Sequence, residues 1–158
     1  MRAGIGFDAH AFAPGRPLVL GGVEIPGEPG LHGHSDADVL SHAIADALLG
    51  AAGLGDLGVV FGVDDPRLRD ASSLEMVRVV AGMLAGEHLG IQNVDAVVIC
   101  ERPRIAPHRG AMGAALAAAL GIEQGLISVK ATSTDRMGFT GRGEGVAAMV
   151  IALVGPSF

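Results

Sequence analysis

Residues 93–100 read Asn-Val-Asp-Ala-Val-Val-Ile-Cys, and the apolar run at 96–99 inside this stretch decides the fold class. A short, continuous run of apolar and β-branched residues is typical of a strand in the interior of a sheet. The helical pattern before it stops near Gly90, and Pro107 suits the first turn of a helix after it. A strand flanked by helices favours a sheet with helices packed against it.

Further elements extend in both directions from this strand. Ser35 with Asp38, and Ser72 with Glu75, are capping-box patterns that predict where the first two helices begin. The predicted elements are a strand over 2–7, a hairpin over 17–25 turning at Gly21-Gly22, helices over about 35–53, 72–90 and 107–120, and strands over 126–132 and 146–154. This order predicts a single α+β domain over 1–158, a two-layer sandwich in which helices cover one face of a mixed sheet of about four strands, with a small N-terminal hairpin.

The composition excludes several classes of protein. Of 158 residues, 49% are hydrophobic and 18% are charged, which favours a packed core over a disordered chain. A formal net charge of −6 argues against a general nucleic-acid binder. The longest uncharged stretches, 110–122 and 145–158, are shorter than the roughly 18–20 apolar residues of a membrane span. We therefore expect no nucleic-acid partner and no membrane partner.

Two further features concern location and assembly. One cysteine, Cys100, excludes an internal disulfide and indicates a reducing compartment. A strand pattern begins within a few residues of Met1, where a signal sequence would otherwise stand. We therefore expect a soluble, cytoplasmic protein. The mean hydropathy of +0.46 is high for a small domain, which predicts that sister subunits cover part of its apolar surface.

Asp8, His10 and His42 are candidate metal ligands. Residues two apart on a strand project from one face, so Asp8 and His10 can reach one ion, and His42 comes from the first predicted helix. Three nitrogen and oxygen ligands with one open position are what a catalytic zinc site requires. Asp38 and Asp46 lie four residues on either side of His42, so each is a candidate to orient its imidazole. The alternative is a histidine on a solvated helix face beside ordinary surface carboxylates.

Two loops around this helix are candidate ligand contacts. Residues 33–36, Gly-His-Ser-Asp, precede it, and a helix start with free N–H groups attracts anions, to which His34 can donate. The alternative is that Ser35 only caps the helix and His34 is a loop residue. The stretch 54–58 places the Asp56 carboxylate in a turn, which is either a ligand contact or a connecting loop.

A third candidate region lies near the C-terminus. Residues 132–135, Thr-Ser-Thr-Asp, are followed by the glycine-rich stretch 138–145 with Arg142. Three hydroxyls, an acid suited to magnesium and an arginine can together hold a diphosphate, although no Walker A loop is present. The alternative is a glycine-rich turn between two strands.

Four separated motifs resemble the family of 2-C-methyl-D-erythritol 2,4-cyclodiphosphate synthases of the non-mevalonate isoprenoid pathway. They are Gly-Ile-Gly-Phe-Asp-Ala-His at 4–10, the stretch 33–50 from Gly-His-Ser-Asp to Asp-Ala-Leu-Leu-Gly, Gly-Asp-Leu-Gly at 55–58, and Gly-Phe-Thr-Gly-Arg-Gly-Glu-Gly at 138–145. The match runs in order and with matching spacing from residue 4 to about 154.

The resemblance implies a homotrimer with active sites between adjacent subunits. It implies the cytidine diphosphate substrate 4-diphosphocytidyl-2-C-methyl-D-erythritol 2-phosphate, whose 2-phosphate attacks the β-phosphorus, closes a cyclic diphosphate and expels CMP. The enzyme would be a metal-dependent phosphorus-oxygen lyase. Asp8, His10 and His42 match the zinc ligands of the family, and Asp135 stands where the family usually has the glutamate that holds magnesium or manganese. Zinc would be a Lewis acid and a template.

The resemblance also implies roles for other residues. His34 and Ser133 match catalytic positions that polarise the reacting phosphates, and Asp56 and Gly58 match contacts to the erythritol part. The other implied substrate contacts are Asp8, His10, Ser35, Phe61, Asp65, Cys100, Pro103, Ala106, Ala131, Thr132, Asp135, Phe139 and Arg142. Residues 100–106 and 130–133 match the cytidine pocket of the neighbouring subunit, Phe139 matches a diphosphate-side position, and Arg142 matches the lining near the trimer axis. The family's Pro-Asp after Phe61 is replaced here by residues 62–63, Gly-Val, which implies the loss of one side-chain contact.

Two other functions are compatible with these residues. A zinc-dependent phosphohydrolase acting on nucleotide diphosphates would use the same metal and phosphate contacts with water as nucleophile. A non-catalytic trimeric sensor of phosphates or isoprenoid diphosphates would use the 142–144 loop and would not need the three metal ligands as an intact set.

Overall fold

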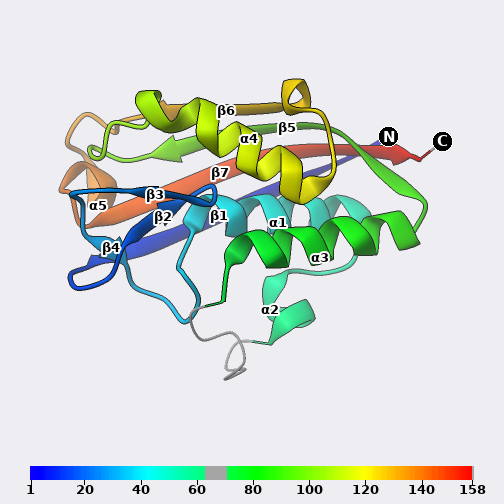
Figure 1. Ribbon diagram of the computed structural model, residues 1–158, viewed down its shortest axis with the longest axis horizontal. Helices are drawn as coiled ribbons and strands as arrows, with labels where there is room; N and C mark the ends of the chain where they lie inside the picture. The colour runs from blue at the N-terminus through cyan, green and yellow to red at the C-terminus, as the bar shows by residue number, and fades with distance from the viewer. Residues whose placement is uncertain (63–70, 158) are drawn as a thin grey trace.

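A mixed five-stranded sheet forms one layer of the computed structural model, which describes residues 1–62 and 71–157 (Figure 1). The strand order is β4-β1-β7-β5-β6; β5 and β6 are parallel and the other neighbours are antiparallel. The strands are β1 (Arg2–Ala13), β4 (Gly30–Leu31), β5 (Leu89–Ile99), β6 (Ile127–Thr132) and β7 (Gly145–Pro156). The sequence predicted about four strands, and β4 is the additional one, because two residues are too few to show a periodic pattern.

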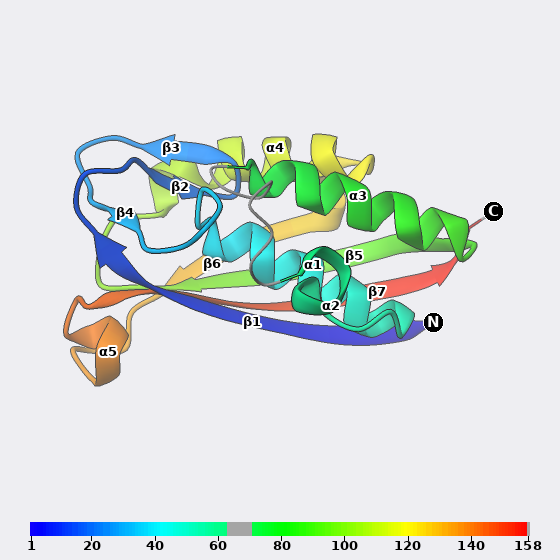
Figure 2. The same ribbon diagram turned by 90° about the horizontal axis from the view of Figure 1, so that it is seen from below.

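Three long helices, α1 (Val39–Ala52), α3 (Ser73–Gly86) and α4 (Arg109–Leu120), cover one face of this sheet (Figure 2). The predicted α+β arrangement with helices on one face is therefore confirmed. Strands β2 (Leu18–Leu20) and β3 (Val23–Ile25) form the predicted hairpin, with positive φ angles at Gly21 and Gly22 in its turn. Within the described residues, no helix has both the length and the apolar character needed to cross a membrane.

Short helical segments occupy several connections. They are α2 (Leu57–Phe61), α5 (Gly138–Gly141) and the 3-10 turns η2 (Ala106–His108) and η3 (Gln124–Leu126). Both α2 and α5 lie in segments that the sequence interpretation left as loops, because four or five residues carry no helical periodicity. Helix α3 ends at Gly86, before the predicted stop near Gly90, because β5 begins at Leu89.

The start of α1 differs from the prediction. Its N-cap is Asp38, whose carboxylate accepts hydrogen bonds from Ser41 N–H at 3.0 Å and Ser41 Oγ–H at 2.7 Å. The same carboxylate accepts from the N–H groups of Gly21 at 2.8 Å and Gly22 at 2.7 Å. The capping box predicted at Ser35 is therefore wrong, since the buried Asp38 both caps the helix and holds the hairpin turn against it.

Strand β1 lies unusually close to α1. A Cβ atom built on Gly6 would be 1.8 Å from the carbonyl oxygen of Ala43, and one on Gly4 would be 2.0 Å from that of Ala47. Only glycine at these two positions of β1 permits this approach. The helix therefore rests directly on the backbone of the strand.

The face of the sheet opposite the long helices is exposed, and it is apolar along β1 and β7. Ile5 and Phe7 on β1 are 66% and 52% exposed, and Met149 and Ile151 on β7 are 39% and 54% exposed. They are cross-strand partners, Ile5 with Ile151 and Phe7 with Met149. For the same reason Val97 is only half-buried, although the predicted interior strand suggested that it would be covered on both sides. We call Ile5, Phe7, Met149 and Ile151 the open-face patch.

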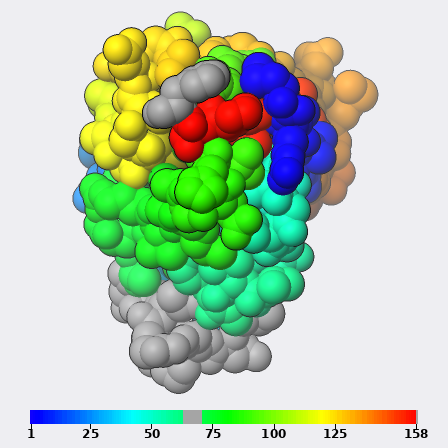
Figure 3. All heavy atoms as spheres, turned by 90° about the vertical axis from the view of Figure 1, so that its right-hand side faces the viewer, coloured from blue at the N-terminus to red at the C-terminus, as the bar shows by residue number. Residues whose placement is uncertain are grey.

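The two ends of the described chain lie together. Arg2 of β1 is paired with Val154 of β7, and Figure 3 shows the start of β1 beside the end of β7, next to the end of α3. The opposite ends of β1, β5 and β6 lie at the other end of the molecule (Figure 1).

Candidate active site

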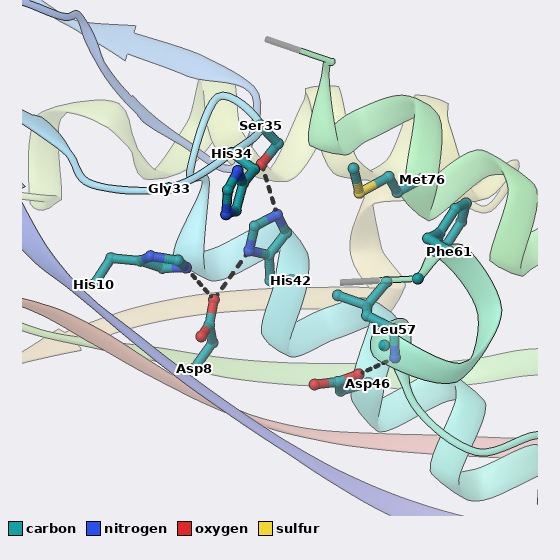
Figure 4. A pocket seen from close by; sticks show the side chains of 12 residues that line it. Asp8, His10, Gly33, His34, Ser35, His42, Asp46, Leu57, Phe61 and Met76 are labelled. Carbon is teal, nitrogen blue, oxygen red and sulfur yellow. Dashed lines mark hydrogen bonds and ion pairs between the residues drawn. The ribbon is translucent and has the colours of Figure 1, made fainter. Parts of the chain in front are cut away.

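Asp8 and His10 on β1 meet His42 on α1 (Figure 4). Asp8 Oδ2 lies 2.9 Å from His10 Nε2 and 3.0 Å from His42 Nδ1. One ligand atom of each residue lies within 4.8 Å of the others, and the described residues contain no other group of three or more His, Cys, Asp or Glu with this property. The structure therefore brings the three predicted metal ligands together.

The close contact between β1 and α1 explains this convergence. Gly4, Gly6, Asp8 and His10 alternate along one face of β1, the face that α1 covers. Because the helix sits directly on Gly6 through Ala43, the preceding residue His42 reaches Asp8. The glycines of β1 therefore allow α1 to pack closely on the strand, and this packing also brings the metal ligands together.

The geometry fits a divalent metal. Tetrahedral zinc with bonds of about 2.0–2.1 Å separates its ligand atoms by roughly 3.4 Å, so the observed separations of 2.9 and 3.0 Å need only a small adjustment. His10 Nδ1 lies 2.6 Å from the carbonyl oxygen of His32. A carbonyl only accepts, so Nδ1 carries a proton, and in the neutral ring the lone pair that can bind a metal is on Nε2.

The electrostatics of the cluster also suit a cation. Burial acts to raise the pKa of Asp8, but the hydrogen bonds and charges of His10 and His42 outweigh it and hold this pKa well below its usual range. The hydrogen bond to Asp8 raises the pKa of His10. Asp8 is therefore a carboxylate at neutral pH, which is the form that binds metals.

A cavity of about 290 Å³ opens beside the three ligands. It brings several predicted site residues together with residues that the sequence did not indicate. Its lining residues are Asp8, His10, Gly33, His34, Ser35, His42, Asp46, Leu57, Gly58, Phe61, Gly62 and Met76. Predicted residue Asp56 is not among them; it is the N-cap of α2, where its carboxylate accepts a hydrogen bond from Val59 N–H at 2.9 Å.

The loop that carries His34 is held by Arg16, which the sequence interpretation missed. The guanidinium donates to the carbonyl oxygen of Gly33 at 2.7 Å and to that of Ser35. These bonds fix the backbone on both sides of His34 and so set where its imidazole enters the cavity. Nothing local to Arg16 in the sequence could reveal this, because its partners lie 17 and 19 residues away.

Asp38 and Asp46 do not orient His42 as predicted. Asp38 is committed to the helix cap, and Asp46 accepts a hydrogen bond from Leu57 N–H at 2.8 Å. At the start of α1, where the sequence predicted an anion site, the Asp38 carboxylate accepts from the Ser41 amide. Burial raises the pKa of Asp46, which lines the cavity.

A second group of predicted residues lies at the opposite edge of the sheet. Cys100 follows β5, and its N–H donates to the carbonyl oxygen of Thr132 at the end of β6. Ala131 and Thr132 pair with the end of β5, and the carbonyl oxygen of Pro103 lies 3.6 Å from the Cys100 sulfur. Ser133 follows β6, and Ala106 begins η2. The carboxyl ends of neighbouring parallel strands form a crevice that commonly binds ligands. Cys100 is buried, and burial raises the pKa of its thiol to about 11, so the thiol is protonated at neutral pH.

The metal ligands and the group around Cys100 lie at the same height along the strands, but they are far apart across the sheet. Ala9 is paired with Ala147, Ala147 with Ile99, and Ile99 with Thr132. Three strand spacings of about 4.8 Å separate β1 from β6 along this line, or roughly 14 Å. Within one chain, the metal ligands and Ser133 therefore face different edges.

The remaining predicted residues lie near the glycine-rich segment. Asp135 is exposed and has a left-handed backbone with φ 53°. Phe139 lines a hollow of about 320 Å³ beside the backbone of His10. Arg142 pairs with Glu144 at 2.6 Å and lines a hollow of about 550 Å³ with Arg102. Asp65 lies outside the described residues.

The fold and this cluster define a protein with three residues placed to bind a divalent metal beside an open cavity. The family model of the YgbB family matches residues 1–155. The 2-C-methyl-D-erythritol 2,4-cyclodiphosphate synthase of Rubrobacter xylanophilus is 58% identical over 97% of this chain and 94% of that protein. The corresponding protein of Symbiobacterium thermophilum is 53% identical over 98% of each chain.

Solved structures agree with these relatives. The CDP complex of IspF from Plasmodium falciparum has a TM-score of 0.87 and 29% identity, covering 99% of this chain and 97% of that one. The bifunctional IspDF of Campylobacter jejuni has a TM-score of 0.95 and 38% identity, and 99% of this chain matches 42% of that longer chain.

The chain belongs to the YgbB family of 2-C-methyl-D-erythritol 2,4-cyclodiphosphate synthases. The predicted resemblance is therefore confirmed, together with the expected function of a metal-dependent lyase of isoprenoid biosynthesis at the level of the family.

Proposed function

We propose that this chain converts 4-diphosphocytidyl-2-C-methyl-D-erythritol 2-phosphate into 2-C-methyl-D-erythritol 2,4-cyclodiphosphate and CMP. The observation that carries the proposal is the Asp8, His10 and His42 cluster, which opens into a cavity lined by His34. In the reaction, an oxygen of the 2-phosphate bonds to the β-phosphorus. The bond from the β-phosphorus to the oxygen shared with the α-phosphorus breaks, and its electron pair leaves with CMP.

Different residues of the chain bind the metal and orient the substrate phosphates. Asp8, His10 and His42 would hold zinc, which when bound supplies a Lewis acid for a phosphate oxygen. The Arg16-held loop places the His34 imidazole where it can donate to a reacting phosphate. Because the attacking phosphate is already an anion, no general base is needed, and positioning with charge neutralisation carries the rate.

A complete site requires a second copy of the chain. The cytidine-binding candidates around Cys100 and Ser133 lie roughly 14 Å across the sheet from the metal ligands, as three strand spacings require. A relative was solved as a CDP complex, which supports a cytidine pocket here. We infer a homotrimer in which β6 of one subunit meets β1 of the next, with the open-face patch buried between subunits.

Replacing Ile151 by lysine tests this assembly. Ile151 is 54% exposed at the centre of the open-face patch, and three buried ammonium groups at one interface are strongly unfavourable. We expect Ile151→Lys to be a folded monomer with at least about 100-fold lower turnover, measured by sedimentation and product assay, because complete sites are lost. Glu24→Lys, at an exposed position of the hairpin strand β3, is the control for an introduced lysine and should stay trimeric. A fully active monomer would contradict the shared site.

Asp135 is proposed to hold magnesium. It is an exposed carboxylate beside Ser133, whose hydroxyl accepts from the Asp135 N–H at 3.4 Å. Its side chain is shorter than the glutamate usual in the family, which favours binding through a water. We expect Asp135→Ala to keep zinc bound but to need about 10-fold more magnesium for half-maximal rate, with Glu123→Ala as control. An unchanged magnesium titration removes Asp135 from the site.

Phosphorus NMR of the reaction tests the function directly. With the cytidylyl substrate, zinc and magnesium, the proposed reaction gives a cyclic diphosphate and CMP in equal amounts. CDP or free phosphate as product would identify a phosphohydrolase, and binding without turnover would identify a sensor. A cytoplasmic location and a single domain over 1–158 belong to the same proposal.

A further inference from the structure

A buried serine and a carboxylate lie directly behind His42. Its Nε2 atom, on the side of the ring away from Asp8, is 2.9 Å from Ser73 Oγ. Ser73 is the first residue of α3 and is fully buried. Its hydroxyl contacts Asp36 Oδ1, and its N–H donates to Asp36 Oδ2 at 3.0 Å. Neither Ser73 nor Asp36 is among the residues assigned above to the substrate or the metal.

The direction of the hydrogen bonds along this chain is determined by Asp36. An ionised carboxylate only accepts, so the Ser73 hydroxyl donates its single proton to Asp36. Ser73 Oγ then has only lone pairs left for His42, so Nε2 must carry a proton and donate it to Ser73. The neutral imidazole therefore has its lone pair on Nδ1, the atom that faces Asp8 at 3.0 Å.

We propose that Ser73, with Asp36 behind it, is a positioning residue that holds His42 in the tautomer and orientation required for metal binding through Nδ1. The inference rests on the proposed metal site. It gives His42 the same kind of support that His10 receives from the His32 carbonyl. Partners of this kind behind a metal ligand typically change metal affinity by about 10–100-fold when they are removed.

The hydroxyl of Ser35 is a second possible partner for the same nitrogen of His42. Ser35 Oγ lies 3.2 Å from the same Nε2 atom and accepts from Ala37 N–H at 3.1 Å. It also lies 3.5 Å from Ser73 Oγ, which accepts the Ser35 proton because its own proton goes to Asp36. Without Ser73, that proton can go to Nε2, which would shift the neutral ring to the tautomer with the proton on Nδ1. This tautomer offers no lone pair to the metal. Ser73 therefore excludes a competing hydrogen bond as well as making its own.

The test compares zinc affinities of full-length variants. The metal-free proteins are titrated with zinc alone against a chromophoric chelator, with thermal unfolding as the measure of folding. We expect Ser73→Ala to bind zinc about 10–100-fold more weakly than wild type, and Asp36→Asn to weaken it in the same direction. Ser72→Ala is the matched control, because Ser72 is the adjacent residue and its side chain makes no cap hydrogen bond. Ser73→Thr retains the hydroxyl and should restore affinity to within about 3-fold of wild type.

A second readout follows the proton itself. In the zinc-loaded wild type, ¹H–¹⁵N NMR of the imidazoles should show a His42 Nε2–H that exchanges slowly with water, and this signal should be lost in Ser73→Ala and kept in Ser72→Ala. Wild-type zinc affinity in a folded Ser73→Ala, or an equal loss in Ser72→Ala, overturns the inference. If Ser73→Ala does not fold, Asp36→Asn decides by the same criteria. Failure of the wild type to bind zinc would instead overturn the proposed metal site.

Discussion

We expect His42→Ala to lose its zinc and to lower turnover by about 1,000-fold or more while the protein stays folded. His42 is one of only three ligands, and the remaining pair, Asp8 and His10, lies on one strand and leaves half of the coordination sphere to water. The helix packs through its other faces, so the truncation leaves the core intact. Metal analysis of the purified variant and a product assay measure the two effects.

His88→Asn is the matched control for the loss of an imidazole. His88 is exposed between α3 and β5, with a positive φ of 56° that asparagine tolerates. We expect this variant to keep both zinc and activity. Activity of a metal-depleted His42→Ala at the wild-type level would end the proposal that this cluster is the reaction centre.

The second large effect is expected from Gly6→Ala. The added Cβ would lie 1.8 Å from the carbonyl oxygen of Ala43, a backbone atom that cannot move without displacing α1 from β1. We expect the free energy of unfolding to fall by about 3 kcal/mol or more, or folding to fail, in chemical denaturation. Any folded fraction should also bind zinc more weakly, because the shift of α1 separates His42 from Asp8.

Gly50→Ala is the control for the same chemical change. Gly50 lies on α1 near its C-terminal end, where an added Cβ would find Ile5 O no closer than 4.0 Å. Alanine in an open helical position is expected to stabilise by roughly 0.5–1 kcal/mol relative to glycine. Equal destabilisation by both substitutions would contradict the account based on close approach at Gly6.

The elements with long patterns could be predicted from the sequence. The Gly21-Gly22 turn, the stops at Gly53 and Gly121 and the strands around 126–132 and 146–154 are local signals, and the structure confirms them within a few residues. The two-residue β4 and the short helices α2 and α5 contain too few residues to show a period. Ser35 resembles the start of a capping box, yet Asp38 caps α1, because four donors from two segments converge on its carboxylate.

The candidate site was likewise predictable from the sequence only in part. Asp8, His10 and His42 are recognisable as ligands by residue type, and their motifs pointed to the family. Arg16, Asp36 and Ser73 carry no comparable signal, because each acts through partners that folding brings close.

The order of residues in this chain was sufficient to specify its helices, its strands, its metal-binding side chains and its family, because each depends on residue type and on spacing of a few positions. The three-dimensional arrangement alone decided which atoms support those side chains. It placed α1 on the glycines of β1, turned His42 Nδ1 toward Asp8, and separated the metal ligands from Ser133 by three strand spacings. Contacts between residues distant in the chain arise from packing, and packing is a property of the whole folded molecule.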